Sequence, residues 1–125
     1  MASILLVEDS KMIVATITLL LEKVGHQIVT AYNGNEGVKA AQSDNFDLLL
    51  TDIVMPEKDG IQTIIEVRRD KPDLRIIAMS GGSLAGMEQL DHAMKIGANA
   101  IMPKPFTADQ LFAVVSEQLS QRAAA

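Results

Sequence analysis

The sequence predicts an α/β fold: a doubly wound, five-stranded parallel sheet with helices on both faces. Five short apolar runs, typical of buried strands, alternate with longer segments whose apolar residues recur at helical spacing. The chain has 125 residues, and no repeat, linker or low-complexity segment divides it. A single domain over residues 1–125 is therefore expected.

The first run, Ser3–Val7, is continuously apolar after its serine, as expected for a strand that is covered on both faces. Ser10 offers an N-cap to a helix over Lys11–Val24, which Gly25 ends. Gln27–Ala31 follows as the second strand. This first unit already has the strand–helix–strand order of a parallel sheet.

The Asn33-Gly34 pair predicts a turn before a short helix over Asn35–Ser43. Phe46–Leu50 is the third expected strand, and Ile61–Arg69 is a helix that ends before Pro72. Leu74–Met79 is the fourth strand. This part of the chain repeats the same alternation.

Leu84–Lys95 is expected to be a helix that ends at Gly97, followed by the fifth strand, Ala98–Met102. Thr107 and Gln110 have the spacing of a capping box and begin the last helix. The apolar residues expected on the core side of the Leu84–Lys95 helix are Leu84, Met87, Leu90 and Met94. Of these, Met87 and Met94 are expected to fill the core.

Composition excludes several classes of protein. The net charge of −5 and the absence of a Lys/Arg cluster argue against direct binding to nucleic acid. The absence of cysteine excludes disulfides and thiolate metal sites, and a cytoplasmic location fits it. No apolar run approaches the ~20 residues that a membrane span needs, and the first residues do not resemble a signal peptide.

Polar residues follow four of the five expected strands. Glu8 and Asp9 follow the first, Asp52 the third, Ser80 the fourth and Lys104 the fifth. Because ligands of open α/β sheets bind beyond the carboxyl ends of the strands, these side chains are expected to meet. Three gathered carboxylates repel one another, and a hard cation such as Mg²⁺ relieves that repulsion. A carboxylate can also act as a nucleophile and form an aspartyl phosphate.

Each of these residues also has a simpler interpretation. Asp9 can begin a helix, Asp52 can be a turn residue, and Lys104 can be a solvated surface lysine. The glycine-rich segment Ser80–Ser83 can be an ordinary loop. The combination favours a site, because separate loops would otherwise deliver complementary groups to one edge by chance.

Five segments together resemble the response-regulator receiver family, and the resemblance covers essentially the whole chain. The fold it implies is the flavodoxin-like receiver fold with strand order 2-1-3-4-5. It also implies a phosphorylation-activated switch of a two-component system, which is not an enzyme beyond its own phosphorylation and dephosphorylation. The matching segments are Leu5–Ser10, Asp47–Asp52, Met55-Pro56 with Asp59-Gly60, Ala78–Gly81 and Lys104–Phe106.

The resemblance implies that Asp52 is the phospho-acceptor and that Ser80 and Lys104 contact the phosphoryl group. It further implies a cis Lys104-Pro105 peptide bond. The cofactor would be Mg²⁺, with Mn²⁺ as an alternative. The implied metal ligands are the carboxylates of Glu8, Asp9 and Asp52 and the main-chain carbonyl of Val54.

The chain departs from many receivers at two places. Many carry threonine at the position of Ser80, where the hydroxyl is kept, and an aromatic residue at Ile101, where it is lost. The second departure puts the usual coupling between hydroxyl and aromatic side chain in doubt. Val54 and Gly82 occupy positions that tune phosphate loss, and neither can hydrogen-bond an attacking water. A long-lived phosphoryl group is therefore expected.

The implied phosphoryl donor is a sensor histidine kinase or a histidine phosphotransfer protein. The first helix carries a second, thinner apolar stripe, on which Met12 and Ala15 are candidate contacts for the donor. An unidentified downstream protein would receive the signal, with Leu84, Met87 and Glu88–Asp91 as candidate contacts. The chain would then be either a stand-alone shuttle or adaptor, or one domain of a longer regulator.

Three other functions are compatible with parts of the pattern. A phosphate-independent adaptor of the same fold would account for the missing aromatic side chain at position 101. It would not account for the presence of the site residues Glu8, Asp9, Asp52, Ser80 and Lys104. A haloacid-dehalogenase-like phosphatase would need a second aspartate where Val54 stands. A flavin carrier shares the topology, but aromatic residues make up only 3% of the chain.

Overall fold

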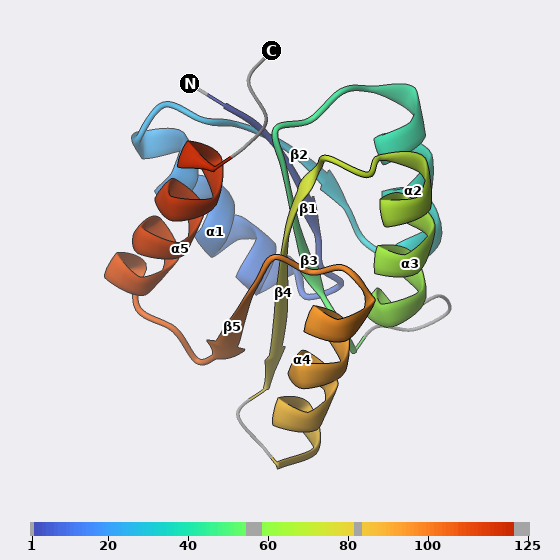
Figure 1. The fold of residues 1–125 in the computed structure, drawn as a ribbon. Coiled ribbons are helices and arrows are strands. Elements are labelled where there is room, and N and C mark those ends of the chain that lie inside the picture. Colours follow the sequence, from blue (N-terminus) through green and yellow to red (C-terminus); the bar gives the residue numbers. More distant parts are fainter. Residues whose placement is uncertain (1, 55–58, 82–83, 122–125) are drawn as a thin grey trace.

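The computed structural model describes residues 2–54, 59–81 and 84–121, in which strands and helices alternate along the chain (Figure 1). The strands are β1 (Ser3–Val7), β2 (Gln27–Ala31), β3 (Leu48–Asp52), β4 (Arg75–Gly81) and β5 (Ala100–Lys104). The helices are α1 (Lys11–Lys23), α2 (Gly34–Ser43), α3 (Gly60–Asp70), α4 (Leu84–Ile96) and α5 (Ala108–Ser120).

All strand pairs are parallel, and the strands lie in the order β2-β1-β3-β4-β5. This order confirms the predicted fold. β1 lies between β2 and β3, with Leu5 opposite Val29 of β2 on one side and Leu49 of β3 on the other. Because the winding direction reverses between β1 and β3, the sheet has a switch point at their carboxyl ends.

The core consists of two apolar layers, one on each face of the sheet (Figure 1). On one face, α1 and α5 contribute Ile17 and Leu111, which pack against Leu6 and Leu50. On the other face, α2, α3 and α4 pack against the alternate strand residues, such as Leu49. Residues of β3 are buried on both sides, which explains why its sequence is a continuous apolar run.

Three strands end later than the sequence predicts. The expected strands Phe46–Leu50, Leu74–Met79 and Ala98–Met102 each extend two residues further, as β3, β4 and β5. They continue through polar residues because the backbone pairing continues there: Asp52 is paired with Met79, and Gly81 with Lys104. Asp52, Ser80 and Lys104 therefore lie within the last two residues of their strands rather than in the loops after them.

Side-chain caps begin four of the helices. Ser10 caps α1 and Thr107 forms the expected capping box with Gln110 at α5. Asp59 caps α3. Asn33, expected in a turn, instead caps α2 by accepting from the backbone N–H of Glu36.

Helix α4 differs from the expectation for its core side. Leu90 is 1% exposed, but Met87 is 57% and Met94 43% exposed, so the prediction that these two methionines fill the core is wrong. The buried partner of Leu90 is Ala93, three residues later, which turns the core stripe away from both methionines. The side chain of Leu84 lies outside the described residues.

Candidate functional site

The carboxyl ends of β1, β3, β4 and β5 bring the predicted site residues to one edge of the sheet. Glu8 directly follows β1, and Asp52 and Lys104 are the last residues of β3 and β5. Ser80 is the second-to-last residue of β4. Four separate strands thus deliver the groups that the sequence predicted would meet.

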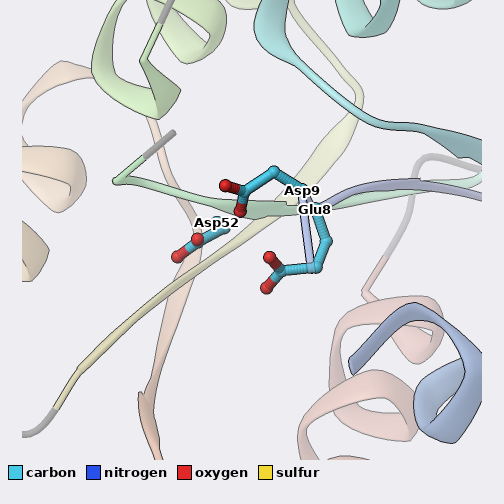
Figure 2. Close-up of side chains that lie close together, drawn as sticks. All are labelled: Glu8, Asp9 and Asp52. Carbon is cyan, nitrogen blue, oxygen red and sulfur yellow. The ribbon is translucent and has the colours of Figure 1, made fainter. Parts of the chain in front are cut away.

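Glu8, Asp9 and Asp52 form a compact group of carboxylates (Figure 2). Each offers one oxygen, and these oxygens lie within 4.8 Å of one another. Glu8 and Asp52 are buried, whereas Asp9 is exposed, so the group opens to solvent on the Asp9 side. An all-oxygen donor set with one accessible side fits a hard divalent cation that keeps some of its waters.

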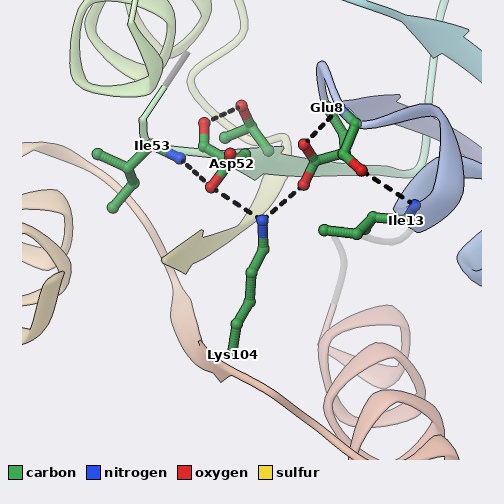
Figure 3. A network of polar contacts seen from close by, with 7 residues as sticks. Glu8, Ile13, Asp52, Ile53 and Lys104 are labelled. Carbon is green, nitrogen blue, oxygen red and sulfur yellow. Dashed lines mark hydrogen bonds and ion pairs between the residues drawn. The ribbon is translucent and has the colours of Figure 1, made fainter. Parts of the chain in front are cut away.

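Lys104 joins the two buried carboxylates (Figure 3). Its Nζ donates to Oε1 of Glu8 at 2.7 Å and lies 3.3 Å from Oδ1 of Asp52. The lysine side chain is 20% exposed. One ammonium is thus shared by the carboxylate of Glu8, directly after β1, and that of Asp52 at the end of β3, while Asp9 adds a third carboxylate. The group therefore contains more acidic than basic side chains.

Burial is the main influence on the acid–base properties of this group. It raises the pKa of Glu8 and the pKa of Asp52 above their ordinary values, although Lys104 acts against both shifts. Burial also opposes the charge on Lys104, but the contacts with Glu8 and Asp52 outweigh it and raise the pKa of the ammonium. The site therefore holds negative charge that the fold does not fully compensate.

The backbone around Asp52 is held from several directions. Oδ1 of Asp52 accepts from the backbone N–H of Ile53 at 2.9 Å, and the Thr51 hydroxyl donates to the Asp52 carbonyl oxygen at 2.9 Å. Gly60, the first residue of α3, donates its N–H to the Ile53 carbonyl at 2.7 Å. A Cβ atom at Gly60 would overlap the Asp52 carbonyl oxygen, so only glycine lets α3 pack there.

The sequence did not indicate two hydrogen bonds that hold the site, one to Glu8 and one to Asp52. The Ser10 backbone N–H donates to Oε2 of Glu8 at 3.0 Å, in addition to the helix cap that its side chain provides. Thr51 holds the Asp52 carbonyl through its hydroxyl. Neither has a sequence signal, because a backbone donor carries none and a buried threonine in a strand is common.

Ser80 lies at this edge but is not bonded to the charged group. Its side chain is 1% exposed, and its Oγ has no hydrogen-bond partner among the described residues. Such an unpaired buried hydroxyl carries a desolvation penalty that a new acceptor would relieve. The predicted cis peptide bond between Lys104 and Pro105 is present.

Other predicted positions are placed less completely. The Val54 side chain is 60% exposed, next to the site in the chain, and Ile101 on β5 is 38% exposed. Gly82 and Met55-Pro56 lie outside the described residues.

An apolar groove with a volume of about 380 Å³ lies beside the charged group. Met12, a residue of the second apolar stripe of the first helix, lines this groove and is 76% exposed. Lys104 also lines the groove and contacts Glu8 and Asp52, so the groove and the charged group share one residue. The lining residues are Met12, Ile13, Thr16, Ile17, Lys104, Pro105 and Phe106.

Comparisons of sequence and of structure with known proteins both match response-regulator receiver domains. The sequence model of the family described as "Response regulator receiver domain" matches residues 4–116. The chain is 33% identical over 119 residues to the DNA-binding transcriptional regulator NtrC of Azospirillum brasilense, covering 95% of this chain and 24% of NtrC. It is 34% identical over 115 residues to the transcriptional regulatory protein CpxR of Klebsiella pneumoniae, covering 90% of this chain and 47% of CpxR. The chain thus spans less than half the length of these relatives.

Solved structures agree with this result. A response regulator receiver domain protein from Clostridium thermocellum has a TM-score of 0.90 and 28% identity, with 97% of this chain and 96% of that chain covered. The receiver domain of a sensor histidine kinase from Pseudomonas aeruginosa has a TM-score of 0.88 and 25% identity, with 96% and 98% covered. That structure has a magnesium ion coordinated in its active-site cleft.

Proposed function

This chain belongs to the response regulator receiver domain family, and we propose that Asp52 is its phospho-acceptor, assisted by Mg²⁺. The observation that carries the proposal is the shared ammonium: Lys104 bridges Glu8, directly after β1, and Asp52 of β3, beside the exposed carboxylate of Asp9. A structural ion pair would need one carboxylate. Three carboxylates around one lysine suit a site that gains a cation and a phosphoryl group.

In the proposed reaction, a carboxylate oxygen of Asp52 attacks the phosphorus atom of a phosphohistidine. The P–N bond breaks, and its electron pair leaves with the imidazole nitrogen of the donor. Oδ1 of Asp52 is held by Lys104 and by the Ile53 N–H, so the contacts described in the structure leave Oδ2 for the attack. Lys104 is then in position to neutralise a phosphoryl oxygen.

A bound Mg²⁺ would neutralise charge on the transferred phosphoryl group. Asp9 and Asp52 are the proposed direct ligands, with Glu8 acting directly or through a water and the Val54 main-chain carbonyl completing the set. Oε1 and Oε2 of Glu8 are already engaged by Lys104 and the Ser10 N–H, which favours the water-mediated role. Mn²⁺ has similar ligand preferences and is the expected substitute.

Ser80 is proposed to bond the phosphoryl group once it is present. Its buried hydroxyl has no partner to give up within the described structure. A phosphoryl oxygen would therefore supply a hydrogen bond that the unphosphorylated protein lacks. This gain favours the state in which Ser80 has moved, and phosphorylation shifts the protein toward that state.

The phosphoryl donor is proposed to be a sensor histidine kinase or a histidine phosphotransfer protein in the cytoplasm, which suits a chain without cysteine. The apolar groove lined by Met12 and Lys104 is the proposed contact for the helix that carries the phosphohistidine. An apolar helix face seated there would bring its histidine next to Asp52. The downstream partner is proposed to be a protein, since the net charge of −5 disfavours nucleic acid.

The proposal is tested by intact mass spectrometry after incubation with phosphoramidate and Mg²⁺. A gain of ~80 Da is expected for the wild type, from one phosphoryl group. The gain should disappear in Asp52→Asn and after chelation of the metal. Asp91→Asn, which removes an exposed carboxylate on α4, is the matched control and should be phosphorylated normally.

Absence of the gain in folded, Mg²⁺-saturated wild type would contradict the proposal and favour a phosphate-independent adaptor. The same experiment, followed over time after the donor is removed, tests the expected long lifetime of the phosphoryl group. Val54 offers no hydrogen-bonding side chain to an attacking water. A lifetime of only seconds would contradict that expectation.

A further inference from the structure

Helix α4 and the end of β4 meet in a contact that has no room for a side chain. Gly86 lies in the first turn of α4 and is buried. A Cβ atom at this position would overlap the carbonyl oxygen of Gly81 and lie 3.2 Å from Oγ of Ser80. Because the first obstacle is strand backbone, it cannot swing aside as a flexible side chain would. Glycine at position 86 thus allows α4 to rest directly on the strand end.

The same strand end carries the hydroxyl that the proposed phosphorylation would move. Ser80 precedes Gly81 in β4, and its buried Oγ has no hydrogen-bond partner among the described residues. A movement of Ser80 toward a phosphoryl group therefore breaks no hydrogen bond that the structure describes. It would, however, disturb the surface on which α4 rests.

Ile101 is poorly placed to transmit such a movement. In the register of β4 and β5 it stands opposite Ala78, whereas Ser80 is opposite Pro103. The Ile101 side chain is 38% exposed and has no polar atom to follow the serine hydroxyl. The contact between Gly86 and the end of β4, in contrast, connects Ser80 with a helix.

We propose that the contact of Gly86 with Gly81 and Ser80 transmits phosphorylation of Asp52 to α4, in place of an aromatic side chain at position 101. The inference rests on the proposed function. When Ser80 turns toward the phosphoryl group, the strand end shifts and α4 moves with it, because close-packed contacts transmit displacement. Met87, the next residue along the helix, is 57% exposed, so the movement would change the position of an apolar side chain that a partner protein can contact.

Hydrogen–deuterium exchange of the α4 amides tests this, with and without phosphoramidate and Mg²⁺. The phosphorylated fraction is measured in parallel by intact mass. In the wild type, phosphorylation should change α4 exchange by about fivefold or more, the lower end of typical coupling between sites. In Gly86→Ala, α4 should already be displaced, so phosphorylation should proceed while the exchange response is lost.

Two variants serve as matched controls. Gly81→Ala adds the same methyl group on the other side of the contact, where a Cβ atom meets nothing within 4 Å, and should keep the response. Ile101→Ala should also keep it. Ser80→Ala provides a second test that does not depend on the packing of α4: its phosphorylated molecules should show no α4 response, whatever the extent of phosphorylation.

The outcomes separate the two proposals. Failure of the wild type to gain mass would overturn the proposed function, and the inference with it. Normal mass gain without an α4 response, or a wild-type response in Gly86→Ala, would overturn the inference alone. Loss of the response in Ile101→Ala, with retention in Ser80→Ala, would assign the coupling to β5 instead.

Discussion

The two ends of the parallel sheet hold a partly buried cation in different ways. At the amino end, the guanidinium of Arg68 on α3 is surrounded by neutral oxygens that the chain itself supplies. At the carboxyl end, Lys104 is shared by Glu8 and Asp52, with Asp9 close by. One end is complete within the fold, whereas the other leaves negative charge for a ligand to neutralise.

Arg68 makes its bonds to the loops that lead into β4 and β5. Its Nε and Nη2 both donate to the Gly97 carbonyl, at 3.1 Å and 2.7 Å, and Nη2 also donates to Oδ1 of Asn99 at 2.9 Å. Nη1 donates to the carbonyls of Lys71, Pro72 and Leu74. Burial, aided by the charge of Arg75, lowers the pKa of the guanidinium. This arrangement fixes the connections on which the strands depend.

The difference teaches how one fold separates stability from switching. The bonds from Arg68 to Gly97, Asn99 and the 71–74 loop, which we call the Arg68 clamp, use neutral acceptors. No ligand or proton is needed to complete them. The site at Asp52 keeps carboxylates whose burial raises their pKa, and an unpaired hydroxyl at Ser80. Functional sites are commonly kept at some expense of stability in this way.

The largest expected effect comes from breaking the clamp. Arg68→Ala should lower the free energy of unfolding by about 3 kcal/mol, because it leaves several partly buried carbonyls without their donor. Urea unfolding measures this change. Arg69→Ala is the matched control: its side chain is 70% exposed and pairs loosely with Asp70 at 3.8 Å, so a change within about 0.5 kcal/mol is expected. Equal losses in the two variants would refute the clamp.

A smaller effect is expected from removing the shared ammonium. Lys104→Met leaves the buried carboxylates of Glu8 and Asp52 unpaired and should cost about 2 kcal/mol at neutral pH without Mg²⁺. In the control, Lys95→Met, an exposed pair with Asp91 is lost and stability should change by about 0.5 kcal/mol or less. Urea unfolding of both variants measures these changes. An unchanged, wild-type midpoint for Lys104→Met would show that Lys104 does not stabilise the two buried carboxylates.

The smallest effect is a dependence on pH. Since burial raises the pKa of Asp52, the folded protein binds this proton more readily than the unfolded chain. The resulting stability is full below the ordinary value of 3.8 and is lost as pH rises through the raised pKa. Relative to Asp52→Asn, the wild type should therefore gain stability as pH falls from neutral toward this window. A difference between the two proteins that stays constant with pH would contradict this.

The sequence predicted the fold because its strands are continuous apolar runs with helical segments between them. Hydrophobic pattern could not locate the ends of β3, β4 and β5, since Asp52, Ser80 and Lys104 are polar yet remain paired in the sheet. The pattern also placed Met87 and Met94 toward the core, although both are exposed. In each case the outcome depends on tertiary contacts, which periodicity does not contain.

The carboxylates and the lysine of the site could be predicted because parallel strands bring their carboxyl ends to one edge. The clamp could not. In the sequence, Arg68 is simply one of two adjacent arginines. Its acceptors Gly97 and Asn99 lie 29 and 31 residues away, so no local pattern indicates these bonds. The close approach of Gly86 to β4 could not be predicted either, because the sequence does not show which tertiary contact a glycine within a helix makes.

The most direct test of the central claim compares wild type and Asp52→Asn by urea unfolding, each with and without Mg²⁺. Without the metal, Asp52→Asn should be more stable by about 1 kcal/mol, because it removes a buried charge. With Mg²⁺ at about 100 times its Kd, the wild type should gain about 2.7 kcal/mol and become the more stable protein, while the variant gains much less. A lower stability of Asp52→Asn without the metal, or an equal gain in both proteins, would contradict the claim that the carboxyl end is completed by a cation at Asp52.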